Sequence, residues 1–181
     1  MRMQTPDEDL ASAAAGGDRD AFAALLSRHY DRIFGLCVRL TGVRAEAEDL
    51  TQDICCALPA KLSSYRQAAR FTTWLYRVTV NAAHDRRRRM ATHRKAADGW
   101  GDWEVARRAE IAEAAAAGDW LTATMARLTP ELRDTLALTL GEELSQKDAA
   151  EVLGVSEGTV AWRMSEVKKR LREMARAEGM L

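Results

Sequence analysis

The sequence has few of the residues that build catalytic or metal sites. It contains three histidines, His29, His84 and His93, which are scattered, and three cysteines, Cys37, Cys55 and Cys56. None of them has the short Cys/His spacing of a metal-ligand set. A Ser/His/Asp pattern and a glycine-rich phosphate loop are also missing. We therefore expect no cofactor and no metal, and the composition argues against an enzyme.

The cysteine count also argues against a disulfide framework. Three is an odd number, and two of the cysteines are adjacent. The simplest interpretation is that they are small buried side chains on two helices. A redox-sensing thiol and a metal site remain as alternatives.

Long apolar segments are absent as well. The sequence has no apolar run of 18 residues, and its N-terminus is acidic and lacks a secretory apolar region. We therefore expect a cytoplasmic protein that does not insert into membranes.

Proline and glycine are scarce, with 3 and 11 residues among 181, whereas hydrophobic residues make up 47%. The chain is rich in alanine, leucine, arginine and glutamate, which favour helices, and it has few β-branched runs. We predict an all-α protein of two small helical domains joined by a linker. The predicted divisions are a flexible N-terminus over 1–17, a first domain over 18–95, a linker over 96–118 and a second domain over 119–181.

The formal net charge of zero conceals one strongly basic segment. Residues 70–95 contain eight basic residues and one acidic residue. By contrast, residues 1–69 contain eight basic and ten acidic residues, and 96–131 contain three and seven. A chain that is neutral overall but basic along one strip is expected to bind a polyanion through that strip.

The basic segment is predicted to form one helix that starts near Thr72 or Thr73, whose hydroxyl can cap the first turn. One face of this helix can stack on an unpaired base, read a base edge and hold phosphates. It consists of Trp74, Arg77, Asn81, Asp85 and Arg88. The four arginines 86–89 go all round the helix, so they cannot all serve the helix dipole. The segment favours nucleic-acid contact over a solvated basic helix end.

Two helices are predicted before the basic segment. The first begins at Asp18 or Asp20 and ends at Gly42, where glycine allows a left-handed cap. The second begins near Arg44, and Pro59 is expected to kink or end it because proline lacks an amide hydrogen. An acidic face on the second helix is equally consistent with solvent and with a partner. It comprises Glu46, Glu48, Asp49 and Asp53, with Gln52 beside them.

Residues 145–177 have the pattern of a helix-turn-helix. Ser145 is predicted to cap a helix over 146–153, and Ser156 a helix from Glu157 to about Ala177. The DNA-binding form needs a small residue at the helix crossing, a glycine in the turn and a branched residue in the second helix. Ala150, Gly154 and Val160 meet these needs. An ordinary helical hairpin is the alternative.

These segments together resemble the bacterial sigma factors of the extracytoplasmic-function type, over roughly residues 18–90 and 119–176. The motifs that carry the resemblance are Ala21-Phe22 with Leu25, Asp49-Leu-Thr-Gln-Asp53, Phe71-Thr-Thr-Trp-Leu-Tyr-Arg77 with Asn81 and Asp85, and Leu153-Gly-Val-Ser156 with Gly158-Thr-Val160 and Arg163. The resemblance implies a factor, without catalysis of its own, that directs RNA polymerase to promoters under the control of an anti-sigma factor. Its implied partners are the β′ clamp helices and β subunit of core polymerase, promoter DNA and the anti-sigma factor.

The resemblance also implies roles for single residues. Asp49, Gln52 and Asp53 would dock on the β′ clamp helices. The helix from Phe71 would bind and melt the minus-ten element, and the loop Ser63–Gln67 would hold a flipped base. The implied minus-ten residues are Tyr65, Arg66, Phe71, Trp74, Arg77, Asn81, Asp85, Arg86, Arg87, Arg88 and Arg89. The implied minus-35 residues of the helix-turn-helix are Ser156, Thr159, Trp162, Arg163 and Lys169.

The recognition helix departs from the family pattern. Ala161-Trp162 stand where the family usually has a basic residue and a serine, and Ser165-Glu166 stand where an aromatic residue and an arginine are frequent. We therefore do not carry over the usual minus-35 sequence. Trp162 either makes an apolar contact, for example with a thymine methyl, or serves a protein partner.

Two other functions remain open from the sequence. A two-domain regulator could bind duplex DNA without polymerase, in which case Asp49 and Asp53 would be plain surface. A nuclease would need a carboxylate cluster near the basic segment, where only Asp85 stands.

Overall fold

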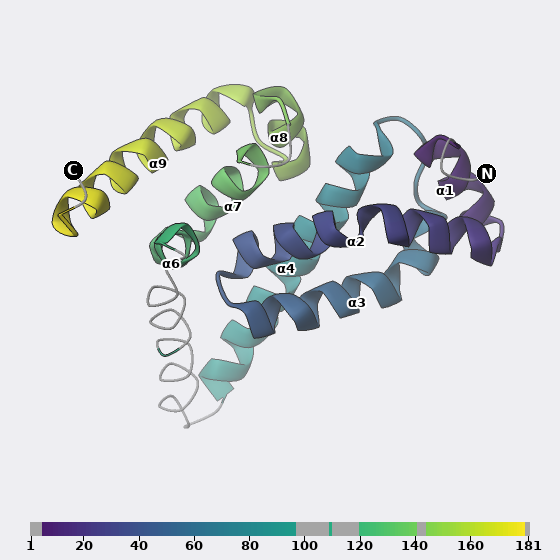
Figure 1. Ribbon diagram of the computed structural model, residues 1–181, viewed down its shortest axis with the longest axis horizontal. Helices are drawn as coiled ribbons and strands as arrows, with labels where there is room; N and C mark the ends of the chain where they lie inside the picture. Colours follow the sequence, from purple (N-terminus) through teal and green to yellow (C-terminus); the bar gives the residue numbers. More distant parts are fainter. Residues whose placement is uncertain (1–4, 97–108, 110–119, 141–143, 180–181) are drawn as a thin grey trace.

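The computed structural model describes residues 5–96, 109, 120–140 and 144–179, and the regular structure in these ranges is helical. The first half of the protein consists of α1 (Asp7–Ala15), α2 (Arg19–Thr41), α3 (Arg44–Leu62) and α4 (Phe71–Ala96). The second half consists of α6 (Trp120–Arg127), α7 (Pro130–Thr139), α8 (Gln146–Leu153) and α9 (Glu157–Ala177) (Figure 1). The predicted all-α class is confirmed. The predicted linker lies almost wholly outside the described residues.

The N-terminal stretch 1–17, which was expected to be flexible, contains α1 over Asp7–Ala15. Leu10 and Ala11 are buried where α1 packs on α2, α3 and α4. The Asp7 carboxylate accepts a hydrogen bond from Arg28, and its other oxygen lies 2.8 Å from Nε2 of His29. A helix with only two buried residues has too weak a periodicity to be recognised from the sequence.

The ends of α2 follow the predicted capping residues. The Asp18 side chain accepts hydrogen bonds from the amides of Asp20 and Ala21, which lack partners within the helix. Gly42 ends α2 with a φ of 72°, which glycine adopts without strain.

Pro59 does not end α3, which continues to Leu62. Because Pro59 lies in the last turn and is exposed, it removes one bond from a part of the helix that water can reach.

The start of α4 differs from the prediction. The helix begins at Phe71, so Thr72 and Thr73 lie inside its first turn and not at its cap. The Phe71 amide donates instead to the side-chain carboxylate of Glu8, at 3.3 Å. A carboxylate from α1 therefore occupies the positive end of α4. No local pattern in the sequence can reveal a partner 63 residues away.

The helix-turn-helix of the second half has the predicted boundaries. Ser145 caps α8 and Ser156 caps α9, each by accepting an amide hydrogen bond three residues ahead. Gly154 forms the turn with a φ of 66°. Ala150 and Val160 are buried between α8 and α9.

The two halves pack against each other, with α7 on α2 and α8 on α4 (Figure 1). Arg133 of α7 is 6% exposed and joins the halves. Its guanidinium donates to the backbone carbonyls of Leu40 and Thr41 in the first half and of Met125, Ala126 and Leu128 in the second. A Cβ at Gly42 would lie 2.9 Å from the Cβ of Ala126 in α6, so the helices approach closely there. The buried apolar cluster is continuous across both halves.

Candidate polymerase and nucleic-acid interfaces

An aromatic cluster forms where the 63–67 loop meets α4. Tyr65, Phe71 and Trp74 lie with ring centroids 5.4–5.6 Å apart, in tilted and edge-on arrangements that aromatic pairs favour. The Tyr65 hydroxyl donates to the carbonyl of Ala69, which holds the loop. Burial raises the pKa of Tyr65, and the nearby carboxylates of Glu8 and Asp7 raise it further.

The side chain of Phe71 is buried, whereas a direct DNA contact requires an exposed side chain. Its side chain is 3% exposed and packs against His29, at a ring distance of 5.3 Å, as well as against the other cluster members. We therefore assign Phe71 to the support of the aromatic cluster. Trp74 is half-buried and Arg66 is exposed, so both remain accessible to a ligand.

A cavity of about 180 Å³ lies beside this cluster, and we call it the loop pocket. It is lined by Ser64, Tyr65, Arg66, Ala68, Ala69, Thr73, Trp74, Arg77 and Glu151. The loop predicted to hold a flipped base and the aromatic residue predicted to stack on one are thus neighbours. Glu151 comes from α8 of the second half. Arg77 donates to its backbone carbonyl at 2.7 Å and lies 3.4 Å from its carboxylate.

The arginines 86–89 fall into two groups. Arg86 lies 3.1 Å from Asp49 and 3.6 Å from Asp53, and Arg87 donates to Asp134 at 2.7 Å. Arg88 pairs with Asp85, and Arg88 and Arg89 are exposed. In this structure, only the second group faces solvent fully. Asn81 and Arg77 are exposed on the same helix, as the sequence predicted.

Asp134 of α7 is a buried carboxylate that the sequence interpretation missed. It is 3% exposed, and its Oδ2 accepts from Arg87 and lies 2.8 Å from Nε2 of His84. Asp134 stands two residues from both Leu132 and Leu136, so it lies on the opposite side of α7 from that apolar stripe, and the local pattern does not mark it as buried.

The acidic residues predicted to dock on polymerase lie together on α3. Asp49, Gln52 and Asp53 are exposed and spaced by three and four residues, which places them on one face of the helix. Their only cation partner among the described residues is Arg86, and the carboxylate side chains stay 68% and 63% exposed. This face is open to a partner.

The predicted minus-35 residues lie along α9. Trp162 is 62% exposed, which is unusual for so large an apolar side chain, and Lys169 is exposed too. Ser156 and Thr159 share a hydrogen bond of 2.8 Å between their hydroxyls. Arg163 is half-buried and lines a cavity between the halves that His84 and Arg87 also line.

Two segments of the chain match known family models. Residues 25–92 match Sigma-70 region 2, and residues 118–171 match Sigma-70 region 4. The chain is also 32% identical over 173 residues to the ECF RNA polymerase sigma factor SigM of Mycobacterium tuberculosis, across 96% of this chain and 86% of that protein. The chain belongs to the ECF sigma factors of RNA polymerase. The two matched segments contain the sequence motifs except Ala21-Phe22, which stands just before residue 25.

Other sigma factors agree with this membership. SigW of Bacillus subtilis is 30% identical over 176 residues, which cover 88% of this chain and 91% of that protein. The structure of CnrH in complex with the cytosolic domain of CnrY matches with a TM-score of 0.67 and 28% identity, over 94% of this chain and 97% of that one. RpoE of Bartonella quintana, solved with the anti-sigma factor NepR, has a TM-score of 0.69 over 86% of this chain and 96% of that one. At 20% identity, this last match shows the shared fold.

As a sigma factor, the protein serves transcription initiation by RNA polymerase at promoter DNA, and the family consists of transcription factors and not of enzymes. Within the described ranges, no three His, Cys, Asp or Glu residues gather as a metal site, and no helix is long and apolar enough to cross a membrane.

The cysteines of the sigma factor have different surroundings. Cys37 is buried in α2, and its burial raises the pKa of the thiol to about 11. Burial also raises the pKa of Cys55, which is half-buried, while Cys56 is exposed. The prediction of buried cysteines therefore holds for Cys37 and not for Cys56.

Proposed function

We propose that the two halves of this sigma factor divide the recognition of the promoter. The first half, over about 18–95, docks on the β′ clamp helices through Asp49, Gln52 and Asp53 and binds the melted minus-ten strand. The second half, over about 119–181, reads the minus-35 duplex and meets the β subunit. The observation that carries the proposal is the loop pocket, because it joins an aromatic face, two arginines and the predicted base-holding loop.

The loop pocket suits an unpaired base. Taking a base out of the duplex stack costs a few kcal/mol, and stacking on an aromatic side chain returns roughly 1–3 kcal/mol per base. Trp74 and Tyr65 supply such faces, and Arg66 and Arg77 supply positive charge for the flanking phosphates. Asn81, exposed one turn further along α4, offers an amide to a base edge. Arg88 and Arg89 would hold the adjoining duplex backbone.

The second half carries a duplex reader in α8 and α9. The N-terminal part of α9 would enter the major groove, where Thr159, Trp162 and Arg163 lie. Trp162 would give an apolar contact such as one to a thymine methyl. Lys169 and the Ser156 hydroxyl would position the helix on phosphates.

Promoter binding requires the halves to separate. The two promoter elements lie about 25 base pairs apart, which is about 85 Å of duplex at 3.4 Å per pair. A compact chain of this length has a diameter of about 40 Å. A chain of 23 residues, the length of segment 97–119, spans at most about 80 Å when fully extended. This reach and the size of the two halves together cover the distance between the two promoter elements. The packed arrangement therefore represents the DNA-free protein.

We also propose control by an anti-sigma factor. The RpoE of Bartonella quintana was solved with such a protein bound. In this chain Trp162 is exposed, and tryptophan is a residue type that is enriched in protein interfaces. We place the protein in the cytoplasm, where RNA polymerase works.

Replacing the acidic face of α3 tests the polymerase contact. The variant Asp49→Ala/Asp53→Ala should lose co-elution with core RNA polymerase while keeping the circular dichroism of the wild type. The variant Asp9→Ala/Asp31→Ala removes two exposed acidic residues elsewhere and should co-elute normally. If both double variants co-elute like the wild type, the α3 face is plain surface and the alternative of a regulator without polymerase gains.

A further inference from the structure

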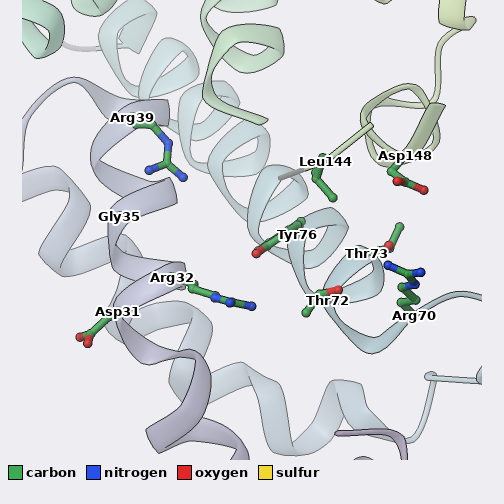
Figure 2. A pocket seen from close by; sticks show the side chains of 10 residues that line it. All are labelled: Asp31, Arg32, Gly35, Arg39, Arg70, Thr72, Thr73, Tyr76, Leu144 and Asp148. Carbon is green, nitrogen blue, oxygen red and sulfur yellow. The ribbon is translucent and has the colours of Figure 1, made fainter. Parts of the chain in front are cut away.

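A larger cavity, of about 480 Å³, lies between α2, the start of α4 and the start of α8. We call it the arginine cleft. It is lined by Asp31, Arg32, Gly35, Arg39, Arg70, Thr72, Thr73, Tyr76, Leu144 and Asp148 (Figure 2). None of these residues belongs to the minus-ten or minus-35 sets predicted from the sequence.

The interior of the cleft is cationic. Arg32 and Arg39 point from α2 into the space between α2 and α4, toward which the Tyr76 hydroxyl also points (Figure 2). Asp31 points away from that space. Asp148 accepts a hydrogen bond of 2.7 Å from the Ser145 hydroxyl, so its carboxylate belongs to the cap of α8.

The guanidiniums of Arg32, Arg39 and Arg70 differ in their hydrogen-bond partners. Arg39 donates to the carbonyl of Ala137 in α7, at 3.0 Å, so it is fixed by the second half. In the ranges that the structure describes, the side chains of Arg32 and Arg70 have no hydrogen bond or ion pair, and both residues are exposed. Three guanidiniums line the cleft against two carboxylates, those of Asp31 and Asp148, so an anion bound among the guanidiniums reduces their mutual repulsion.

The chemistry of the lining favours phosphate. Guanidinium presents a planar fork of donors that matches the oxygens of a phosphate group. The hydroxyls of Thr72 and Tyr76 add donors at the cleft wall. The guanidiniums and hydroxyls of the cleft come from α2 and from the start of α4, including Arg70 just before it, so the site does not depend on one flexible side chain.

The arginine cleft is adjacent to the loop pocket. Thr73 lines both cavities, so they meet at the first turn of α4. A single strand whose base enters the loop pocket would continue past Thr73 with its neighbouring phosphates at the cleft. We propose that the arginine cleft binds phosphate groups through Arg32, Arg70 and Arg39, and that these are the backbone phosphates of the melted promoter strand. The choice of that strand rests on the proposed function of the first half.

The second half covers part of this site in the packed arrangement. Leu144 and Asp148 close one wall, and the Asp148 carboxylate would repel a phosphate. Separation of the halves removes both residues. The cleft would therefore become fully accessible only in the open protein that promoter binding requires.

The salt dependence of DNA binding tests the proposal. The holoenzyme, reconstituted with core polymerase, is titrated with a forked DNA that carries a mapped promoter of this factor and a single-stranded non-template minus-ten region. Each phosphate contact to a single strand contributes about 0.7 to the slope of log K against log salt. Arg32→Gln should lower the slope by about 0.7, and Arg32→Gln/Arg70→Gln by about 1.4. Arg19→Gln, exposed on the same helix but outside the cleft, should leave the slope unchanged.

A second measurement distinguishes the source of the phosphate. The melting temperature of the full chain is recorded with and without inorganic pyrophosphate. If pyrophosphate stabilises the wild type but not the double variant, and the DNA slope is unchanged, the site takes a free phosphate compound and the DNA assignment is overturned. If neither slope nor melting temperature responds to the variants, the phosphate site itself is overturned. Failure of the wild type to co-elute with core polymerase, measured before DNA is added, contradicts the proposed function instead.

Discussion

At the scale of single residues, a buried carboxylate lies at the contact between the halves. The Asp134 carboxylate sits between α7 and α4 with His84 and Arg87 as its partners. Its second oxygen, Oδ1, has no hydrogen-bond partner among the described residues. An ion pair of this kind contributes little compared with apolar packing, but removal of one partner leaves the other uncompensated.

Asp134→Asn should therefore lower the free energy of unfolding by about 1–3 kcal/mol, because the Arg87 guanidinium loses its counter-charge. Urea denaturation followed by circular dichroism measures this. Glu131→Gln, an exposed substitution on the same helix, should change it by less than about 0.5 kcal/mol. Equal midpoints for the two variants would show that Asp134 does not hold the halves.

The cysteines should react at very different rates. The pKa of Cys37 is raised to about 11 by burial, so its thiol stays protonated in the folded protein at pH 8. Iodoacetamide at pH 8, with mass spectrometry, should modify Cys56 first and Cys37 only after unfolding. Modification of Cys37 as fast as Cys56 would contradict the buried position.

The same shift has a consequence for stability at high pH. The unfolded thiol ionises near pH 9 and the folded thiol near pH 11, so this contribution to stability is complete below pH 9 and is lost between pH 9 and 11. Wild type should lose more stability in that window than Cys37→Ala does.

At the scale of elements, α1 is a structural part of the first half. Leu10 is 3% exposed in the core, and Glu8 caps α4. Leu10→Ala should cost about 2–4 kcal/mol, as is usual for a buried leucine. Ser12→Ala, on the exposed face of α1, serves as the control. Thermal unfolding measures both, and a Leu10→Ala variant as stable as Ser12→Ala would mean that α1 does not contribute to the fold.

Some elements could be predicted from the sequence and others could not. The caps Asp18, Ser145 and Ser156 and the turn at Gly154 depend on residues within three or four positions, so the sequence determines them locally. The Glu8–Phe71 bond and the Arg133–Leu40 bond join residues 63 and 93 positions apart, and such pairs leave no periodic signal. The burial of Phe71 has the same kind of cause, because its ring packs against His29 of the distant helix α2 as well as against Tyr65 and Trp74.

The candidate site divides in the same way. The acidic face of α3 follows from helical spacing alone, and it is exposed as predicted. The inward turn of Arg86 and Arg87 follows from carboxylates on α3 and α7, which the sequence of α4 cannot show. The arginine cleft also needs residues from two distant helices, so no motif marks it.

At the scale of the whole molecule, the packed arrangement predicts a compact free protein. Its radius of gyration in solution should be about 16 Å. Arg133→Met removes the hydrogen bonds from the Arg133 guanidinium to Leu40 and Thr41 and should increase this radius, measured by small-angle X-ray scattering. Arg127→Met, which removes an exposed pair with Glu178, should not. An unchanged radius for Arg133→Met would show that the remaining contacts keep the halves together without Arg133.

The central claim is that this protein directs RNA polymerase to promoters, and run-off transcription in vitro tests it most directly. Core RNA polymerase with the purified factor should give discrete transcripts from a subset of fragments of a genomic library. Core polymerase alone, or with Asp49→Ala/Asp53→Ala, should give none of them. The absence of any factor-dependent transcript across the library would contradict the claim.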